Sequence, residues 1–167
     1  MEGLKQISSF ILLLLLQILI FNHINVFGYL NPYVYVLFIL MLPMNYSRAT
    51  VLILAFIMGG CVDVFENSGG VHIAASVFLG WIRRPLLRVA TQKRGVDFEN
   101  LRIGRLSLSN FALYGILGVF IHHFFLFLIE SSQLRDIGTV MVRTLVSTGF
   151  TFIFVMMVHL WNFRKKD

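Results

Sequence analysis

Long apolar runs, separated by short polar segments, are the feature that most limits what this chain can fold into. A helix needs roughly 20 consecutive apolar residues to cross the hydrocarbon core of a bilayer. The chain has 167 residues, of which 57% are hydrophobic and only 13% are charged. This composition lies far from that of an ordinary soluble domain. We therefore expect an all-α integral membrane protein whose short loops leave no room for a separate soluble domain.

The apolar runs predict six membrane-spanning helices in a single domain, residues 1–167. The first run resembles a signal sequence, but no small-x-small cleavage site follows it, so we interpret it as an uncleaved span. The second is the least regular, because Pro32 and Pro43 bound its apolar part. The expected spans are residues 7–21, 30–44, 48–63, 71–87, 109–129 and 137–161.

The distribution of basic residues predicts the orientation, because cytoplasmic segments carry an excess of Lys and Arg. With six spans and the N-terminus inside, 12 of the 14 basic residues lie on the cytoplasmic side, since only Arg135 is outside and Arg143 is within the sixth span. Shifting or deleting one span would scatter these charges over both faces. We therefore expect both termini inside and four acidic residues on the outer side: Asp63, Glu66, Glu130 and Asp136.

This orientation also accounts for the net charge of +6, so we expect no nucleic-acid partner. The longest polar segment, residues 88–105, holds five of the basic residues and could contact anionic lipid or a cytoplasmic protein. The orientation rule alone would place cations there.

A short acidic and glycine-rich turn, residues 59–72, separates the third and fourth spans. It places the carboxylate Asp63 where a spanning helix should end. An ionisable group at this depth generally faces protein or water and has a partner. Asp63 could instead simply end the helix in the headgroup layer. We expect Gly59 to permit close helix packing and Gly70 to permit the turn.

The spans should bring several ionisable groups together in the outer leaflet, and Arg143 is the most constraining of them. It lies six residues, or about 9 Å, inside the sixth span, on a face that also carries Thr139, Ser147 and Thr151. An isolated arginine at this depth is strongly disfavoured, so we expect a carboxylate partner, either Asp63 or Glu130. We call the following residues the polar cluster: Gly59, Asp63, Gly70, His72, His122, His123, Glu130 and Arg143. The cluster could only lock helices together, or it could line a cavity or receive a partner's segment.

The residues give little support for catalysis or for a cofactor. His122 and His123 are adjacent, so on a helix they point about 100° apart, and each would need distant partners to ligate a metal or a haem. The chain has no G-x-S-x-G, H-E-x-x-H or glycine-rich phosphate-loop motif. The single cysteine, Cys61, cannot form an intrachain disulfide. We expect no enzymatic activity, no catalytic residue, no cofactor and no metal.

Several short motifs are spread over the chain: Phe21-Asn22-His23-Ile24, Phe27-Gly28-Tyr29-Leu30-Asn31-Pro32-Tyr33, Leu42-Pro43, Gly59-x3-Asp63-x6-Gly70-x-His72-x-Ala74 and Arg84-Pro85. Together they resemble the rod shape-determining protein MreD family in the form found in Bacteroidota. The resemblance implies a multi-pass subunit of the bacterial cytoplasmic membrane with no known catalytic residues. Such a subunit would bind the bitopic protein MreC and work with the actin-like MreB, the glycosyltransferase RodA and a class B penicillin-binding protein in lateral wall synthesis.

The fold of that family is also similar to the substrate-binding S component of energy-coupling-factor vitamin transporters. This similarity gives an alternative function, the binding or transport of a small molecule such as a vitamin. S components dock their partner through small residues spaced by four in the first helix. Residues 11–20 contain no small residue, which argues against transport. The polar cluster would suit a vitamin pocket and a partner's segment equally well.

Overall fold

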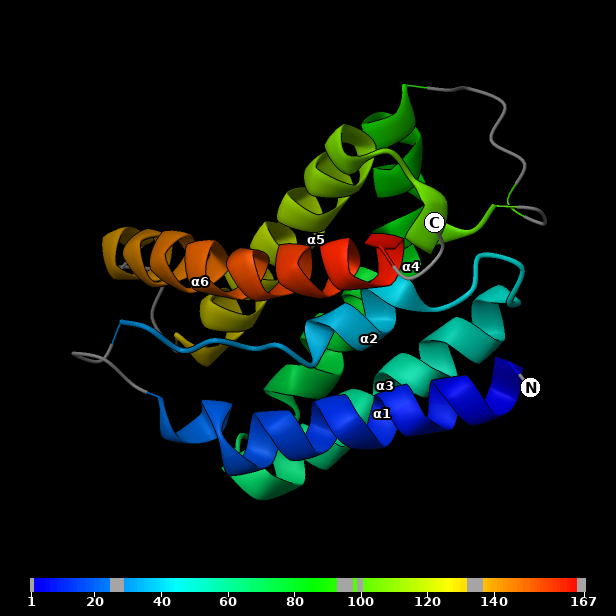
Figure 1. Ribbon diagram of the computed structural model, residues 1–167. Helices are drawn as coiled ribbons and strands as arrows, with labels where there is room; N and C mark the ends of the chain where they lie inside the picture. The colour runs from blue at the N-terminus through cyan, green and yellow to red at the C-terminus, as the bar shows by residue number, and fades with distance from the viewer. Residues whose placement is uncertain (1, 25–28, 93–97, 99–100, 132–136, 165–167) are drawn as a thin grey trace.

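Helices account for every regular element in the part of the chain that the structure describes (Figure 1). The computed structural model describes residues 2–24, 29–92, 98, 101–131 and 137–164, and only the backbone of residues 2 and 162–164. The elements in chain order are α1 (Glu2–Leu19), the 3-10 helix η1 (Phe21–His23), α2 (Val36–Met41), α3 (Arg48–Glu66), α4 (Val71–Thr91), the 3-10 helix η2 (Ile103–Arg105), α5 (Leu108–Glu130) and α6 (Ile137–Arg164).

Four helical segments are long and apolar enough to cross a membrane: Gly3–His23, Arg48–Glu66, Leu108–Glu130 and Ile137–Trp161. The expected all-α membrane protein is confirmed at this level. α4 has 21 residues and is therefore about 32 Å long, but Arg83, Arg84 and Arg88 make its second half less apolar.

The expected span at residues 30–44 is not one continuous helix, which corrects the sequence analysis. Only α2 is helical there, over six residues. Pro32 and Pro43 stand on either side, and Leu42, which precedes the second proline, is extended with ψ 142°. Almost every residue from Tyr33 to Leu42 is buried. Irregular backbone is tolerated at membrane depth when protein covers it, so burial compensates for the missing helix.

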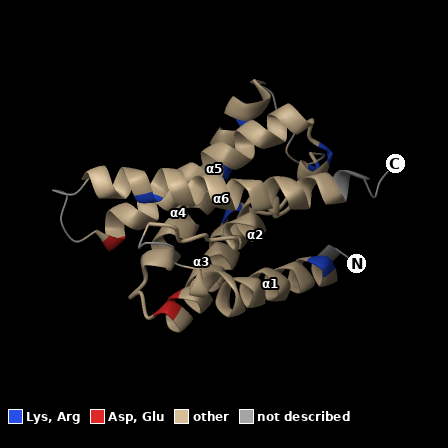
Figure 2. Cartoon of the chain, turned by 60° about the vertical axis from the view of Figure 1, so that its left-hand side comes forward, with Lys and Arg blue, Asp and Glu red and all other residues tan. Residues whose placement is uncertain are grey.

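The helices run back and forth between two ends of the molecule, with α2 in the middle. α4 packs between α3 and α5, α6 packs on α5, and α1 packs on α3, whereas α2 contacts all of α1, α3, α4 and α5. In Figures 1 and 2 the start of α1 and the end of α6 lie at the same end of the molecule. α3 and α5, which end at Glu66 and Glu130, both end towards the opposite side of the molecule (Figure 2).

The core surrounds α2, and the apolar surface of the outer helices remains uncovered. Large aromatic side chains such as Tyr35, Phe38 and Tyr114 are completely buried. By contrast, only 11% of the apolar segment of α1 is buried, and Leu4, Leu12 and many similar side chains are exposed. Such faces suit contact with lipid or with another membrane helix.

Candidate functional site

The polar cluster begins at the close contact between α3 and α4, which Gly59 makes possible. A Cβ added to Gly59 would lie 2.6 Å from the carbonyl oxygen of His72 and 2.8 Å from the Cα of Ile73. Both are backbone atoms, so no side-chain rotation could relieve the overlap. Gly59 therefore permits the close packing that the sequence analysis predicts for it.

The turn between these helices depends on three residues in the left-handed region. Asn67 has φ 52°, Gly69 has φ 66° and Gly70 has φ 95°. Glycine adopts this conformation without steric cost, and asparagine tolerates it better than most residues. Gly70 is the N-cap of α4 but has no side chain to accept from the first backbone N–H groups of that helix.

Asp63 supplies the missing cap from the end of α3. Its Oδ1 accepts from the backbone N–H of His72 at 3.0 Å and from the Ser68 hydroxyl, and its Oδ2 accepts from the backbone N–H of Ile73 at 2.8 Å. The carboxylate is buried and lies at the positive end of the α4 dipole. Asp63 therefore has its hydrogen-bond partners at the α4 N-terminus and in the turn, and the ion pair of Arg143 is with Glu130 instead.

Arg143 pairs with the other expected carboxylate, Glu130 at the end of α5. The Arg143 Nη2 donates to Glu130 Oε2 at 2.9 Å, and the guanidinium lies 4.3 Å from the centroid of the Phe127 ring. The polar face of α6 points inward as expected, since Thr144, Ser147 and Thr151 are all buried. The pair therefore connects α5 to α6 without a link to the turn.

A chain of hydrogen bonds connects three helices and the segment before α2 inside the cluster. His72 Nε2 lies 3.0 Å from Glu66 Oε2, and His72 Nδ1 lies 2.9 Å from the Tyr35 hydroxyl. The same hydroxyl lies 2.9 Å from His122 Nε2. His72, Tyr35 and His122 are buried, whereas the Glu66 side chain is 20% exposed.

A carboxylate only accepts, so His72 Nε2 donates to Glu66, and the Tyr35 hydroxyl bridges His72 Nδ1 and His122 Nε2. Because a hydroxyl has a single proton, one of these two ring nitrogens accepts from Tyr35 and the other donates to it. His122 Nδ1 is buried with no hydrogen-bond partner among the described residues. Alternating donors and acceptors of this kind fix helix positions and can also pass a proton from a rim to an interior.

The two adjacent histidines have different partners, as their spacing predicts. His123 Nδ1 donates to the Val119 carbonyl at 2.8 Å, and the Thr151 hydroxyl lies 3.4 Å from His123 Nε2. The His122 and His123 rings are inclined by 76°. Within the described ranges, no three His, Cys, Asp or Glu side chains are placed to hold a metal ion together.

Three residues on which the cluster depends were not predicted from the sequence, Gln17, Tyr33 and Tyr35, and Glu66 was expected on the outer side but not as a member of the cluster. The buried Gln17 donates to the Pro32 carbonyl at 3.1 Å and accepts from the Tyr35 N–H at 3.4 Å, which anchors the extended backbone before α2. The Tyr33 ring lies against the His72 and His123 rings. The available signal was a single polar or phenolic side chain inside an apolar run, which in a membrane helix demands a partner.

A pocket of about 430 Å³ opens beside Glu66, between the end of α1 and the end of α3. Ile18, Asn22, His23, Phe65 and Glu66 line it. Glu66 thus belongs both to the hydrogen-bonded chain and to a polar pocket, and its Oε1 has no hydrogen-bond partner among the described residues. A ligand in this pocket could form hydrogen bonds with the carboxylate of Glu66, the amide of Asn22 and the imidazole of His23.

No family model, curated protein sequence or solved structure matches the chain. The likeness to the MreD family therefore depends on the sequence motifs, of which the longest coincides with the turn described above.

Proposed function

We propose that the chain is an MreD-type, non-enzymatic scaffold subunit of the bacterial cell-elongation machinery, which supports lateral wall synthesis and maintains cell shape. The observation that carries the proposal is the use of the motif Gly59-x3-Asp63-x6-Gly70-x-His72. All four residues act at the contact between α3 and α4. Gly59 permits the close packing, Asp63 caps α4, Gly70 permits the turn, and the His72 ring is hydrogen-bonded to Tyr35. A rigid joint at the end of a helical bundle suits a surface that another protein recognises.

In this proposal the chain is a multi-pass protein of the cytoplasmic membrane with both termini inside. α4 and the buried segment at residues 30–44 complete six crossings. The alternating direction of the helices supports this number, and so do Asp63, Glu66 and Glu130 in the last turns of α3 and α5, which end away from the start of α1 and the end of α6 (Figure 2). Arginines in the second half of α4 would then lie at the cytoplasmic side.

We place the partner contact at the outer end of α3. Val64 is 79% exposed and Phe65 is 62% exposed; both directly precede Glu66, and Phe65 lines the pocket with it. An apolar edge next to a carboxylate fits an amphipathic segment of a bitopic MreC-like protein, because it offers both burial and a charged hydrogen bond. MreB, RodA and a class B penicillin-binding protein would join through that partner.

Affinity purification of the chain from native bacterial membranes, read by mass spectrometry, tests this function. We expect an MreC-like bitopic protein to co-purify, and we expect Asp63→Ala to lower its yield per folded chain because the joint that presents Val64 and Phe65 is loosened. Ser68→Ala, which removes only one of the bonds to Asp63, is the matched control and should change the yield less. Normal recovery of the partner with Asp63→Ala, measured per folded chain, would contradict the assigned contact.

The pocket beside Glu66 favours a second candidate, the binding of a small molecule in the manner of an S component. Its volume of about 430 Å³ lies within the range of small-molecule sites. Native mass spectrometry of the purified chain separates the two functions. A bound small molecule that Glu66→Gln removes would favour the S-component function, whereas an empty chain that still captures its bitopic partner favours the scaffold.

A further inference from the structure

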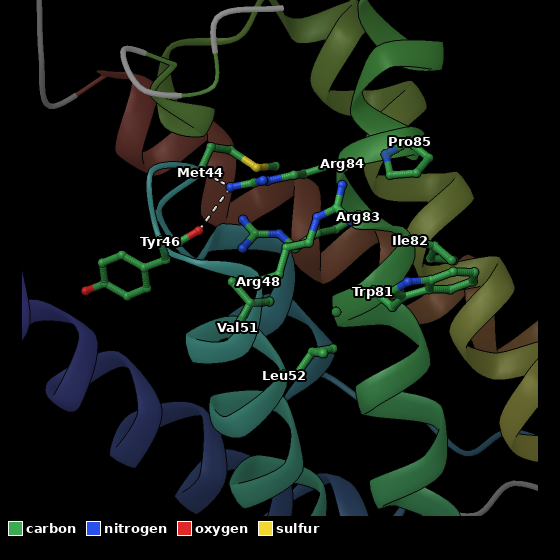
Figure 3. A pocket seen from close by; sticks show the side chains of 11 residues that line it. Met44, Tyr46, Arg48, Val51, Leu52, Trp81, Ile82, Arg83, Arg84 and Pro85 are labelled. Atoms are coloured by element: carbon green, nitrogen blue, oxygen red, sulfur yellow. Dashed lines mark hydrogen bonds between the residues drawn. The ribbon is translucent and has the colours of Figure 1, made fainter.

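A second cavity, distinct from the polar cluster, lies between the start of α3 and the second half of α4 (Figure 3). Its volume is about 260 Å³. Figure 3 shows the side chains of Arg48, Arg83 and Arg84 together beside Met44 and Tyr46. We call this site the arginine cavity. Three cations therefore border a space only large enough for a small group.

The partners of these arginines in the described residues are neutral. Arg83 is buried and donates to the Leu42 carbonyl, and Arg84 Nη2 donates to the carbonyls of Met44 at 3.1 Å and Tyr46 at 3.0 Å. The two salt bridges that the described part of the chain contains lie at the polar cluster. The positive charge at the cavity is thus not neutralised by a described carboxylate, which favours an anion there.

The same cavity has an apolar wall. Val51, Leu52 and Ile82 line it, and Trp81 beside them is 64% exposed. Aromatic side chains next to arginines are typical of the level at which lipid headgroups meet the hydrocarbon core. A free inorganic anion would leave this apolar wall uncovered, whereas an anionic lipid would bury it under an acyl chain.

We propose that the arginine cavity binds the phosphate headgroup of an anionic phospholipid, with its acyl chain against Leu52 and Trp81. Guanidinium groups bind phosphate oxygens through paired, charge-assisted hydrogen bonds, and basic pockets between membrane helices hold anionic headgroups in this way. Arg48 is the side chain free to close on the phosphate, because it is exposed, whereas Arg83 and Arg84 are held by backbone carbonyls. The site depends on the membrane placement and needs no protein partner.

Lipid retention by the full-length chain tests the site. The protein is reconstituted in nanodiscs of phosphatidylcholine with a minor fraction of phosphatidylglycerol, and native mass spectrometry counts the lipids that stay bound. We expect phosphatidylglycerol to be retained preferentially, and Arg48→Gln to lower its retention about fivefold, because it removes a direct charge-assisted hydrogen bond to the phosphate. Arg88→Gln removes the same charge from α4 outside the cavity and should change retention by less than about twofold.

A second pair of variants keeps every charge and changes only the space. Leu52→Trp fills the cavity and should displace the bound lipid, whereas Ile53→Trp, on the outward face of the same helix, should not. Equal retention of the two lipids, or equal losses in the Arg48 and Arg88 variants, would overturn the proposal. Displacement of phosphatidylglycerol by an equal concentration of inorganic phosphate would assign the cavity to the free anion and overturn the lipid assignment.

Discussion

The two ends of α4 are held to their neighbours in opposite ways. At its N-terminus, backbone N–H groups of α4 donate to the Asp63 carboxylate, across a contact where Gly59 leaves no spare room. In its second half, the side chains of Arg83 and Arg84 donate to backbone carbonyls of the segment after α2, and a cavity lies beside them. The first connection is made by rigid backbone and the second by long side chains.

This difference determines what each end can do. A Cβ added to Gly59 would lie 2.6 Å from the His72 carbonyl oxygen, so the two backbones are packed too closely for another arrangement. The N-terminal end of α4 therefore presents a fixed surface, which suits recognition by another protein. Long arginine side chains can adjust to a neighbouring group, so the other end suits an adaptable ligand such as a lipid headgroup. Substitutions should therefore have abrupt effects at the first end and graded effects at the second.

The largest effect is expected from Gly59→Ala, which places a methyl group against the backbone of His72 and Ile73. We expect a loss of about 3 kcal/mol of unfolding free energy, because backbone atoms cannot rotate away and the helices must separate. Gly60→Ala is the matched control, since its Cβ would meet only the Ile73 side chain at 3.7 Å. Denaturant titration in detergent, followed by tryptophan fluorescence, compares the two, and equal stabilities would mean that the joint is not rigid.

An intermediate effect on stability is expected from removing one tyrosine hydroxyl, either Tyr35 in the polar cluster or Tyr114 beside the end of α2. Tyr35→Phe deletes the link between His72 and His122, whereas Tyr114→Phe deletes a single bond of 3.1 Å to the Leu40 carbonyl at the end of α2. Both tyrosines are fully buried. We expect a cost of about 2 kcal/mol for Tyr35→Phe and about 1 kcal/mol for Tyr114→Phe, because the first leaves two buried groups unpaired. The same titration measures both variants. A larger loss of unfolding free energy for Tyr114→Phe than for Tyr35→Phe would mean that the hydrogen bonds linking His72, Tyr35 and His122 do not stabilise the fold.

The long helices could be predicted from the sequence because their apolar runs have the length that a bilayer requires. α3, α5 and α6 begin within two residues of the expected starts, and serine caps mark two of these starts, Ser47 and Ser107. Residues 30–44 have the same apolar character, yet they form only a six-residue helix. An apolar composition indicates that a segment avoids water, but it does not show whether lipid or protein surrounds that segment. The two prolines were the only local sign.

The sequence predicted only some of the residues that meet in the polar cluster and only some of their pairings. Depth along each helix brought His72, His122, Glu130 and Arg143 to one region, because helical rise is constant. Depth gives no rotation about the helix axis, so it could not choose between Asp63 and Glu130 as the partner of Arg143. The choice follows from tertiary contact, since capping α4 occupies the Asp63 oxygens.

The smallest effect is expected from the ion pair of Arg143 and Glu130, which joins the end of α5 to α6. The Glu130 side chain is 45% exposed, so a double-mutant cycle with Arg143→Gln and Glu130→Gln should give a coupling free energy of at most about 1 kcal/mol. Arg143→Gln alone should cost more than Glu130→Gln, because it also removes the cation from the Phe127 ring. If the coupling exceeded the cost of Gly59→Ala, charge pairing would outweigh backbone packing, and the contrast between a rigid backbone joint and an adaptable arginine site would have to be abandoned.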